Sequence, residues 1–234
     1  MISRHRLKVN NMKIALIGYG RMGRLIEQKA LNRGHQIVCI IDKDNLDDFS
    51  SEAFRSADVA IEFTTPQTAE ENIRKAWASG VNVVSGTTGW QNRLPELKQE
   101  LLTNGKALFW SSNYSIGVNL FFALSKRMSE LMQPYKDYSA LITEIHHIHK
   151  LDAPSGTAVT LAELTGIQAE EIKSIRQGEV PGTHILTYES DVDKLELRHE
   201  AKSREGFAVG AVLAAEYLNG KRGFYTMNDL LKIQ

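Results

Sequence analysis

Short apolar runs separated by helical stretches make up the first half of the chain. An apolar run from Lys13 leads into residues 21–33, where apolar side chains recur every three or four positions before Gly34. The next apolar run, "HQIVCIID", ends at Asp42. This order predicts a strand, a helix and a second strand, which is the repeating unit of a parallel sheet.

The same alternation continues in the following residues. The runs "DVAIEFTTP" and "GVNVVSGTTGW" are typical of strands, and between them Ala69, Ile73 and Trp77 fall on one face of a helix. A fifth strand in "ALFWSSNYSIGVN" runs into a polar turn. The pattern therefore predicts an α/β fold with a Rossmann-like, doubly wound parallel sheet.

The second half of the chain has a different pattern. After the helical stretch "LFFALSKRMSELM", the residues "HILTYESDVDKLELRHEAKS" alternate as antiparallel strands do, and "FAVGAVLAAEYLNG" predicts a final apolar helix. We expect an N-terminal extension at 1–11, a parallel-sheet domain formed by 12–116 and 205–234, and a second, α+β domain at 117–204.

Composition narrows the class of protein. The 234 residues are 42% hydrophobic and 24% charged, and 28 Lys and Arg residues balance 28 Asp and Glu residues. This balance lacks the basic surface that nucleic acids and anionic membranes attract, and no apolar run is long enough to span a bilayer. With a polar N-terminus and a single cysteine, Cys39, the chain is expected in the cytoplasm, without nucleic-acid or membrane partners.

Three glycines, where the first strand leads into the first helix, have the spacing of a known motif. Gly18, Gly20 and Gly23 fit the GxGxxG pattern of dinucleotide-binding folds. Gly18 permits a tight turn, Gly20 lets backbone N–H groups approach a pyrophosphate, and Gly23 lets the helix pack close to the strand. Such glycines can also serve the turn alone. Here the two strands, the helix and the acid that ends the second strand all favour a dinucleotide site.

Asp42 bears on the choice of cofactor. It lies 19 positions after Gly23, close to the offset of the ribose-binding acid in dinucleotide folds. A carboxylate there accepts hydrogen bonds from the ribose 2′-OH and repels a 2′-phosphate, which favours NADH, whereas Lys43 can weaken that repulsion. We therefore expect NADH or NADPH as the cofactor.

Further cofactor contacts are expected where the strands end, because ligands of open parallel sheets bind at the carboxyl ends of the strands. The polar turns after the third, fourth and fifth strands lie at such ends. Together with the glycine turn and the ribose acid they give the candidate cofactor-binding residues Gly18, Gly20, Arg21, Met22, Gly23, Asp42, Phe63, Thr64, Thr65, Gly86, Thr87, Thr88, Ser112, Asn113 and Tyr114.

A dense group of titratable residues precedes a Pro-Ser-Gly-Thr turn in "EIHHIHKLDAPSGTA", residues 144–158. One interpretation takes His146, His149 and Asp152 as metal ligands, since imidazole and carboxylate suit zinc. The nearby Lys150 and the lack of other cysteine or histidine clusters in the sequence weaken it. A second interpretation takes the histidines as ordinary loop or strand-end residues, which leaves their clustering unexplained.

The third interpretation is a site for an anionic substrate. The chain breaks before a helix that starts near Thr157. The turn of Ser155, Gly156 and Thr157 then offers N–H groups and hydroxyls at a helix N-terminus, which suits a carboxylate. Lys150 would add positive charge, and His146 would supply a proton donor near neutral pH.

This stretch resembles the signature of the 4-hydroxy-tetrahydrodipicolinate reductase family of bacterial and plant lysine and diaminopimelate biosynthesis. Blocks similar to the family occur elsewhere in the same order, at "GYGRMGR", "FTTP", "GTTG", "SNYSIGVN", "LRHEAKSREGFAVGAV" and "GFYTMNDLL". The resemblance covers the chain from Met12 onward. It implies an oxidoreductase that reduces a small cyclic imine dicarboxylate with NADH or NADPH and assembles as a homotetramer.

The resemblance also implies roles for individual residues. His146 would be the catalytic acid and Lys150 a proton donor that also holds the substrate. His147, Gly156 and Thr157 would be substrate contacts, and no metal is expected.

By the same resemblance, residues 12–116 and 205–234 would form the dinucleotide-binding domain, and 117–204 the substrate-binding and oligomerisation domain. Two other functions are compatible with the glycine turn. One is a related nicotinamide-dependent dehydrogenase acting on another amino-dicarboxylate or oxo acid, and the other is a non-catalytic nucleotide sensor. His146 and Lys150 argue against the sensor, which has no use for a proton donor beside a carboxylate site.

Overall fold

The computed structural model describes residues 11–233, so the extension predicted at 1–11 lies outside the described residues except for Asn11. The chain divides into two compact units. One is Ile116–Gly206, and the other combines the described residues up to Ser115 with those from Phe207 onward. Within residues 11–233, no helix is both long enough and apolar enough to cross a membrane.

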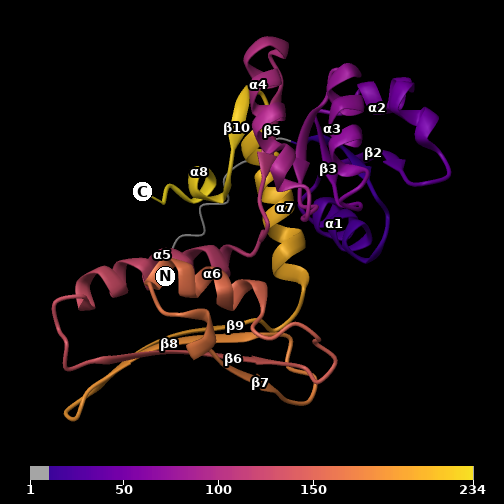
Figure 1. The fold of residues 1–234 in the computed structure, drawn as a ribbon. Helices are drawn as coiled ribbons and strands as arrows, with labels where there is room; N and C mark the ends of the chain where they lie inside the picture. Colours follow the sequence, from indigo (N-terminus) through magenta and orange to yellow (C-terminus); the bar gives the residue numbers. More distant parts are fainter. Residues whose placement is uncertain (1–10, 234) are drawn as a thin grey trace, which may run out of the picture. The chain divides into compact units, whose positions relative to one another are not determined.

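The first unit is built on a six-stranded parallel sheet with the strand order β10-β5-β4-β3-β1-β2. Figure 1 labels β10, β5, β3 and β2 of this sheet. The predicted Rossmann-like sheet is confirmed. The strand β10 at its edge pairs with β5 and was not foreseen, because three residues are too few to show a period. The strands are β1 (Lys13–Ile17), β2 (Gln36–Ile41), β3 (Val59–Glu62), β4 (Asn82–Ser85), β5 (Ala107–Trp110) and β10 (Gly223–Tyr225).

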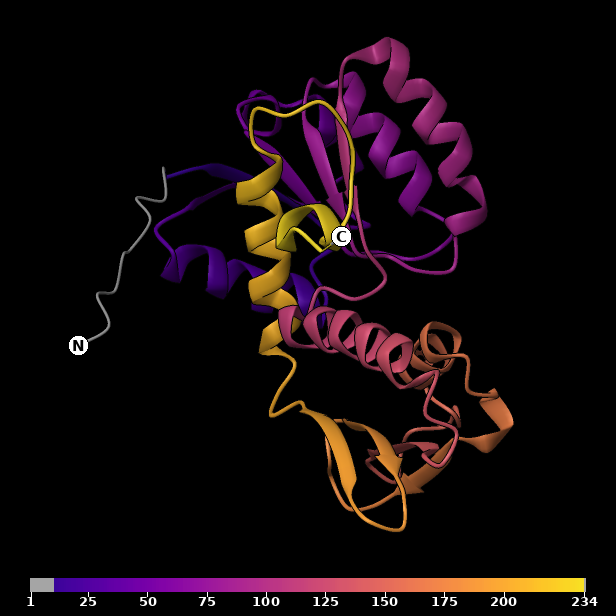
Figure 2. The same cartoon turned by 90° about the vertical axis from the view of Figure 1, so that its left-hand side faces the viewer.

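Helices cover both faces of this sheet. Figure 2 shows α3 and α4 on one side and α1 and α7 on the other. Strand β1 serves both layers, because Ile17 packs towards the α3 side and the neighbouring Leu16 points to the opposite face. The helical segments are α1 (Arg21–Asn32), η1 (Leu46–Ser50), α2 (Glu52–Arg55), α3 (Ala69–Ala78), η2 (Gln91–Arg93), α4 (Leu94–Asn104), α7 (Glu205–Leu218) and α8 (Met227–Leu231).

The late helix α7 returns to the first unit because glycine allows it to approach closely. A Cβ atom at Gly210 would lie 1.8 Å from the carbonyl oxygen of Tyr114, so only glycine fits there. At the other end of α7, Glu216 accepts hydrogen bonds from Arg33 at 2.7 and 2.8 Å and lies 2.8 Å from His35. These contacts join α7 to the end of α1.

The second unit is a four-stranded mixed sheet with the order β7-β6-β8-β9. The predicted antiparallel pairing of β8 and β9 is confirmed, and β6 pairs antiparallel with β8 but parallel with β7. Its strands are β6 (Ser139–His146), β7 (Lys173–Arg176), β8 (Thr183–Glu189) and β9 (Lys194–Glu200). The helical segments are α5 (Ile116–Met132), α6 (Gly156–Thr165) and η3 (Ala169–Glu171).

One face of this second sheet packs against α5 and α6. Ile142 on β6 and Leu186 on β8 form its core with Phe121 of α5 and Leu161 of α6. Since side chains alternate along a strand, Glu144 and His146 lie on the same face as Ile142. Because Ile142 is buried against the helices, Glu144 and His146 also point to the side of the sheet that α5 and α6 cover.

Candidate active site

The glycine turn after β1 has the close contacts that its spacing predicts. Gly18 has a φ of +90°, and a Cβ there would lie 2.2 Å from the carbonyl oxygen of Phe63. A Cβ at Gly23 would lie 2.3 Å from the carbonyl oxygen of Gly18. A Cβ at Gly20 would meet no atom of the described chain within 4 Å. Gly18 and Gly23 are therefore required by packing, whereas Gly20 keeps a surface open.

The N-terminus of α1 is suited to hold a phosphate group. Gly20 is its N-cap, no side chain of the described residues caps the helix, and the first turn carries no acid. The first turn includes Arg21 and Met22, whose backbone N–H groups precede the hydrogen bond from Arg24 N to Gly20 O at 3.1 Å. Such N–H groups and the positive end of the helix dipole attract anions.

Asp42 stands beside this turn. Gly18 N donates to the carbonyl oxygen of Ile41 at 2.8 Å, which joins the glycine turn to the end of β2. Asp42 follows directly and is exposed, and its carboxylate accepts a hydrogen bond from Lys43 N at 2.9 Å. The acid is thus held at the edge of the sheet with its outer face accessible.

The turns after β3 and β4 meet over a buried carboxylate that sequence reasoning missed. Glu62 is fully buried and accepts hydrogen bonds from Ser85 Oγ at 2.5 Å, Thr87 Oγ1 at 2.7 Å, Thr64 N at 2.9 Å and the Thr64 hydroxyl. Burial raises the pKa of Glu62, although these hydrogen bonds oppose the shift. Candidates Thr64 and Thr87 therefore have side chains directed at Glu62.

The other turn candidates differ in exposure. Phe63 lies against Gly86, where a Cβ would come within 2.1 Å of its ring, so glycine is required. Thr65, Thr88 and Ser112 are exposed.

Asn113 and Tyr114 serve the polar turn that follows β5. Asn113 Oδ1 accepts from Ser115 N at 2.9 Å. Tyr114 is 2% exposed, and its hydroxyl donates to Ser85 O at 2.7 Å. Burial raises the pKa of Tyr114 well above its ordinary value. Only its backbone remains for a ligand.

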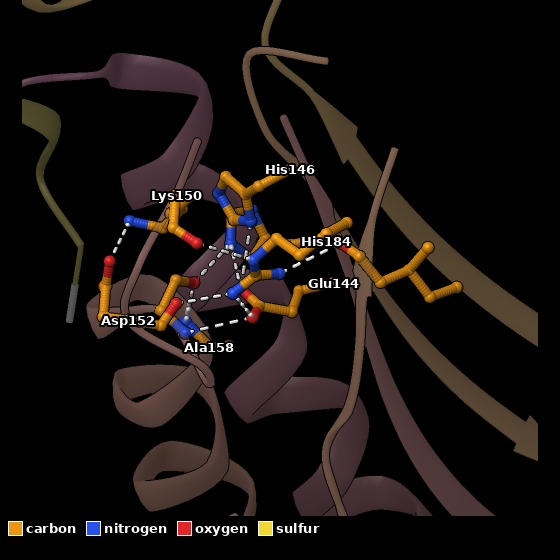
Figure 3. Close-up of polar contacts among 9 residues, drawn as sticks. Glu144, His146, Lys150, Asp152, Ala158 and His184 are labelled. Atoms are coloured by element: carbon orange, nitrogen blue, oxygen red, sulfur yellow. Dashed lines mark hydrogen bonds and ion pairs between the residues drawn. The ribbon is translucent and has the colours of Figure 1, made fainter. Parts of the chain in front are cut away.

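In the second unit, the carboxyl end of β6 gathers a second polar site, shown in Figure 3. Glu144 pairs in register with His184 on β8, and His146 pairs with Arg176 on β7. Glu144 Oε1 accepts hydrogen bonds from Arg176 at 3.1 Å and from Ser155 N at 3.1 Å. Its other oxygen, Oε2, lies 3.1 Å from His146 Nδ1 and 3.9 Å from His184 Nε2.

Burial and charge set the protonation of these groups. Burial alone would raise the pKa of Glu144, but hydrogen bonds from Ser155, Ser174 and Arg176 outweigh it and hold the pKa below its ordinary value. Burial lowers the pKa of His146, and the Glu144 charge opposes that shift. Burial, together with the charge of His146, lowers the pKa of His184 to about 4. Near neutral pH, Glu144 is ionised and His184 is neutral.

The loop that follows β6 carries Lys150. Its Nζ donates to Asp152 Oδ1 at 2.9 Å, and this hydrogen bond lowers the pKa of Asp152. Arg176 donates to the carbonyl oxygens of Lys150 at 3.2 Å and Asp152 at 2.5 Å. The same guanidinium therefore fixes both the loop and Glu144.

The residues considered as metal ligands do not gather. His149 is exposed and lies 3.4 Å from Glu179, and Asp152 pairs with Lys150 rather than with His146. Within residues 11–233, the group whose ligand atoms lie within 4.8 Å of one another is Glu144, His146 and His184. Arg176 already neutralises that carboxylate and opposes a second cation beside it, so we assign no metal there.

The N-terminus of α6 presents the other predicted contacts. Ser155 is its N-cap and is buried, its Oγ accepts from Ala158 N at 3.3 Å, and the same oxygen lies 3.2 Å from His184 Nε2. Gly156 is exposed and Thr157 half-buried, and their N–H groups precede the first intrahelical bond, from Val159 N to Ser155 O. His147 is half-buried beside the site.

Two side chains of this site, Arg176 and His184, were missed because each lies on a strand distant in sequence from the histidine stretch. Only strand pairing brings them opposite His146 and Glu144. A signal existed in the alternation of β8, which predicts His184 on the same face as Leu186. The partner strand could not be known from the sequence.

A glycine turn at a parallel sheet together with a titratable site in a second mixed sheet defines a nicotinamide-dependent oxidoreductase of the Rossmann class. Family models described as "Dihydrodipicolinate reductase, N-terminus" and "Dihydrodipicolinate reductase, C-terminus" match residues 12–114 and 117–231. The chain belongs to the 4-hydroxy-tetrahydrodipicolinate reductase (dihydrodipicolinate reductase) family, whose members act in lysine biosynthesis.

Individual relatives support this membership. The 4-hydroxy-tetrahydrodipicolinate reductase of Christiangramia forsetii is 46% identical over 239 residues, covering 94% of this chain and 98% of the relative. That of Thermosipho africanus is 34% identical, covering 94% and 98%. The structure of dipicolinate-bound dihydrodipicolinate reductase from Paenisporosarcina sp. TG-14 has the same fold, with a TM-score of 0.75 and 21% identity over 93% of this chain and 98% of that one. The predicted family and the oxidoreductase class are confirmed.

Proposed function

We propose that this chain reduces 4-hydroxy-tetrahydrodipicolinate to tetrahydrodipicolinate with hydride from NADH or NADPH. After loss of water the substrate is a conjugated cyclic imine with two carboxylates. Hydride addition leaves a nitrogen or carbon atom that must take up a proton, so the site needs a proton donor and seats for carboxylates. The second unit offers both.

The observation that carries this proposal is a single hydrogen-bonded network. Arg176 bonds to Glu144 beside His146 and also to the loop carbonyls of Lys150 and Asp152. Ser155 N bonds to the same Glu144 carboxylate, so the start of α6 is tied to the network. The carboxylate beside His146, the loop that carries Lys150 and the start of α6 are therefore held by one set of contacts.

Each residue then has a role. His146 is the catalytic acid, and Lys150 holds a substrate carboxylate and serves as a second proton donor. The N–H groups of Gly156 and Thr157 bind the other carboxylate, with the helix dipole behind them. His147 contacts the substrate, whereas Ser155 acts by capping the helix. The negative charge of the bound substrate favours the imidazolium form of His146, which burial disfavours in the free protein.

Replacing the two donors tests these roles. His146→Gln and Lys150→Ala should each lower kcat by about 10²–10⁴-fold, because general acids contribute that much. The dissociation constant for NADH should change little, since the glycine turn belongs to the other unit. Turnover is measured by loss of NADH absorbance with the synthase that makes the unstable substrate.

His149→Gln is the matched control, because His149 lies in the same loop but is exposed and pairs with Glu179. It should keep normal turnover. Near-normal turnover of both His146→Gln and Lys150→Ala would remove the two residues from the mechanism.

In the first unit, the pyrophosphate binds at the N–H groups of Gly20, Arg21 and Met22, and Asp42 binds the ribose. The turns after β3, β4 and β5 then hold the remainder of the dinucleotide through their exposed atoms. The observed openness at Gly20 supports this placement, since a Cβ there would project into free space. Asp42 favours NADH, and Lys43 keeps NADPH usable.

The assembly is a cytoplasmic homotetramer. Leu141, Thr143 and Ile185 lie on the face of the second sheet opposite α5 and α6, and Leu141 is 42% exposed. Burying such a face between copies of the chain removes apolar surface from water. Light scattering coupled to size-exclusion chromatography tests the tetramer, and Leu141→Lys should shift it towards smaller species.

A further inference from the structure

The two carboxylate oxygens of Glu144 are used unequally. Oε1 accepts hydrogen bonds from Arg176 and Ser155 N, both at 3.1 Å. Oε2 is buried and has no aligned donor within the described residues. The nearest nitrogen to it is Nδ1 of His146 at 3.1 Å, which is likewise buried and has no aligned partner. A small rotation of the imidazole would satisfy both atoms with one hydrogen bond.

The other nitrogen of His146, Nε2, lies beside the backbone of Gly182. A Cβ at Gly182 would lie only 3.0 Å from Nε2, so a residue without a side chain fits best beside this nitrogen. Nδ1 is buried and faces a fixed anion, whereas Nε2 points towards the backbone of Gly182 and is not among the buried unpartnered atoms of the described residues. Nδ1 is therefore placed to hydrogen-bond to Glu144, and Nε2 is left to donate a proton to another group.

Charged and titratable groups surround His146 on every element packed against it. Glu144 lies on its own strand, Arg176 on β7, and His184 on β8 with its ring centroid 5.1 Å away. Lys150 and Asp152 come from the following loop and pair with each other. Ser155 at the start of α6 completes the surroundings by fixing Glu144. Glu144 is the one whose carboxylate directly faces the imidazole.

We propose that Glu144 is a positioning residue that keeps a proton on Nδ1 of His146, so that Nε2 delivers the catalytic proton. This inference rests on the proposed role of His146 as the acid. In the step, the Nε2–H bond of the imidazolium breaks and its electron pair stays on Nε2, while the proton bonds to the substrate atom made basic by hydride addition. His146 is left neutral with its proton on Nδ1, and solvent returns a proton to Nε2. Arg176 and Ser155 hold the carboxylate in place.

The variant Glu144→Gln tests the inference through the pH profile of kcat/KM. An acid must be protonated, so activity falls as pH rises through the pKa of His146. Removing an anion within hydrogen-bond distance should move this falling limb to lower pH by about one unit or more. Turnover near neutral pH should then drop by about tenfold or more, because each pH unit is a factor of ten in the protonated fraction. Glu144→Asp keeps the negative charge, so its falling limb should lie at a pH between those of Glu144→Gln and the wild type.

His184→Gln is the matched control. It alters the same cluster but removes no anion, since His184 is neutral in this range. It should leave the position of the limb unchanged even if it lowers the rate. A limb at the wild-type pH in Glu144→Gln would overturn the inference, because a merely structural role lowers activity equally at all pH values.

A measurement on the unaltered protein covers the case in which Glu144→Gln fails to fold. The ¹⁵N shifts of His146 in ¹⁵N-histidine-labelled enzyme, assigned by difference from His146→Gln, report which nitrogen carries the proton. The Nδ1–H tautomer is expected for the neutral ring, and a dominant Nε2–H tautomer would overturn the inference. Normal turnover in His146→Gln would instead refute the proposed role of His146 itself, so the two failures are distinguishable.

Discussion

Thr87 donates its hydroxyl hydrogen to Glu62 at 2.7 Å, which joins the turn after β4 to the end of β3 through a fully buried carboxylate. Thr64 donates to the same carboxylate from its backbone N at 2.9 Å. An ionised carboxylate can accept hydrogen bonds but cannot donate them, so all of these donors converge on one acceptor. The shape of the two turns proposed to hold the cofactor depends on Glu62.

Glu62→Gln should therefore weaken NADH binding. The amide keeps the size of the side chain but replaces one acceptor oxygen with a donor, which leaves a hydroxyl or the amide unpaired at a cost of about 1–3 kcal/mol. We expect a lower melting temperature and about tenfold weaker binding of NADH by calorimetry, taking 1.4 kcal/mol per factor of ten. Glu71→Gln is the control, because Glu71 is exposed and pairs with Lys75 on the surface of α3. Equal NADH affinity in the two variants would show that Glu62 does not shape the turns.

Two alanine variants separate folding from binding at the glycine turn. Gly23→Ala places a Cβ 2.3 Å from the backbone of Gly18, so the first unit should be destabilised by about 1–3 kcal/mol or fail to fold. Gly20→Ala meets no atom within 4 Å and should fold normally. Its methyl group would project where the pyrophosphate is proposed to lie, so NADH binding should weaken. Thermal melting and calorimetry distinguish the two, and full NADH affinity in Gly20→Ala would place the phosphates elsewhere.

The proposed ribose contact makes a prediction about cofactor preference. Asp42→Ser should raise the ratio of kcat/KM for NADPH to that for NADH, because it removes a charge that repels the 2′-phosphate. A rise of about tenfold is expected if the exposed carboxylate contributes about 1.4 kcal/mol to the discrimination. Asp44→Ser, two residues on in the same exposed loop, is the control. If neither variant moves the ratio, Asp42 is not the ribose ligand.

The buried histidine of β8 predicts acid lability of the second unit. The pKa of His184 falls from an ordinary 6.5 to about 4 in the fold. Between these values the unfolded chain binds a proton that the folded chain does not, so stability is fully present above the higher value and falls as pH falls through the window. The effect is on the order of 3 kcal/mol at about 1.4 kcal/mol per unit. Below its ordinary pKa, Glu144 adds to the loss, since its pKa is lowered on folding.

Hydrogen exchange of β6 and β8 amides measures this loss directly. Tryptophan fluorescence would not report on the second unit, because all three tryptophans, Trp77, Trp90 and Trp110, lie in the first unit. His184→Gln should be less stable at neutral pH but should lose less protection on acidification, whereas His149→Gln should behave as the wild type. An unchanged pH slope in His184→Gln would assign the lability to other groups.

Local pattern in the sequence was sufficient for much of the fold. Strand, glycine turn and helix around Gly18 follow from residues adjacent in the chain, because glycine spacing and apolar period are local properties. The N-terminus of α6 was predicted near Thr157 and begins at Gly156, since a serine cap beside glycine marks a helix start. The short strand β10 was missed because it has no period of its own and depends on pairing with β5.

The sequence by itself determined which proton donors and charged side chains are present, and the tertiary structure decided which of them lie together in one site. Residues 144–158 place His146 and Lys150 close together in the chain, so a proton donor and a cation could be expected there. Arg176 and His184 reach Glu144 only through the pairing of β6 with β7 and β8. Likewise Thr87 reaches Glu62 across two strands. Backbone hydrogen bonding between distant strands sets these distances, and no local periodicity encodes the register that brings a buried carboxylate to its partners.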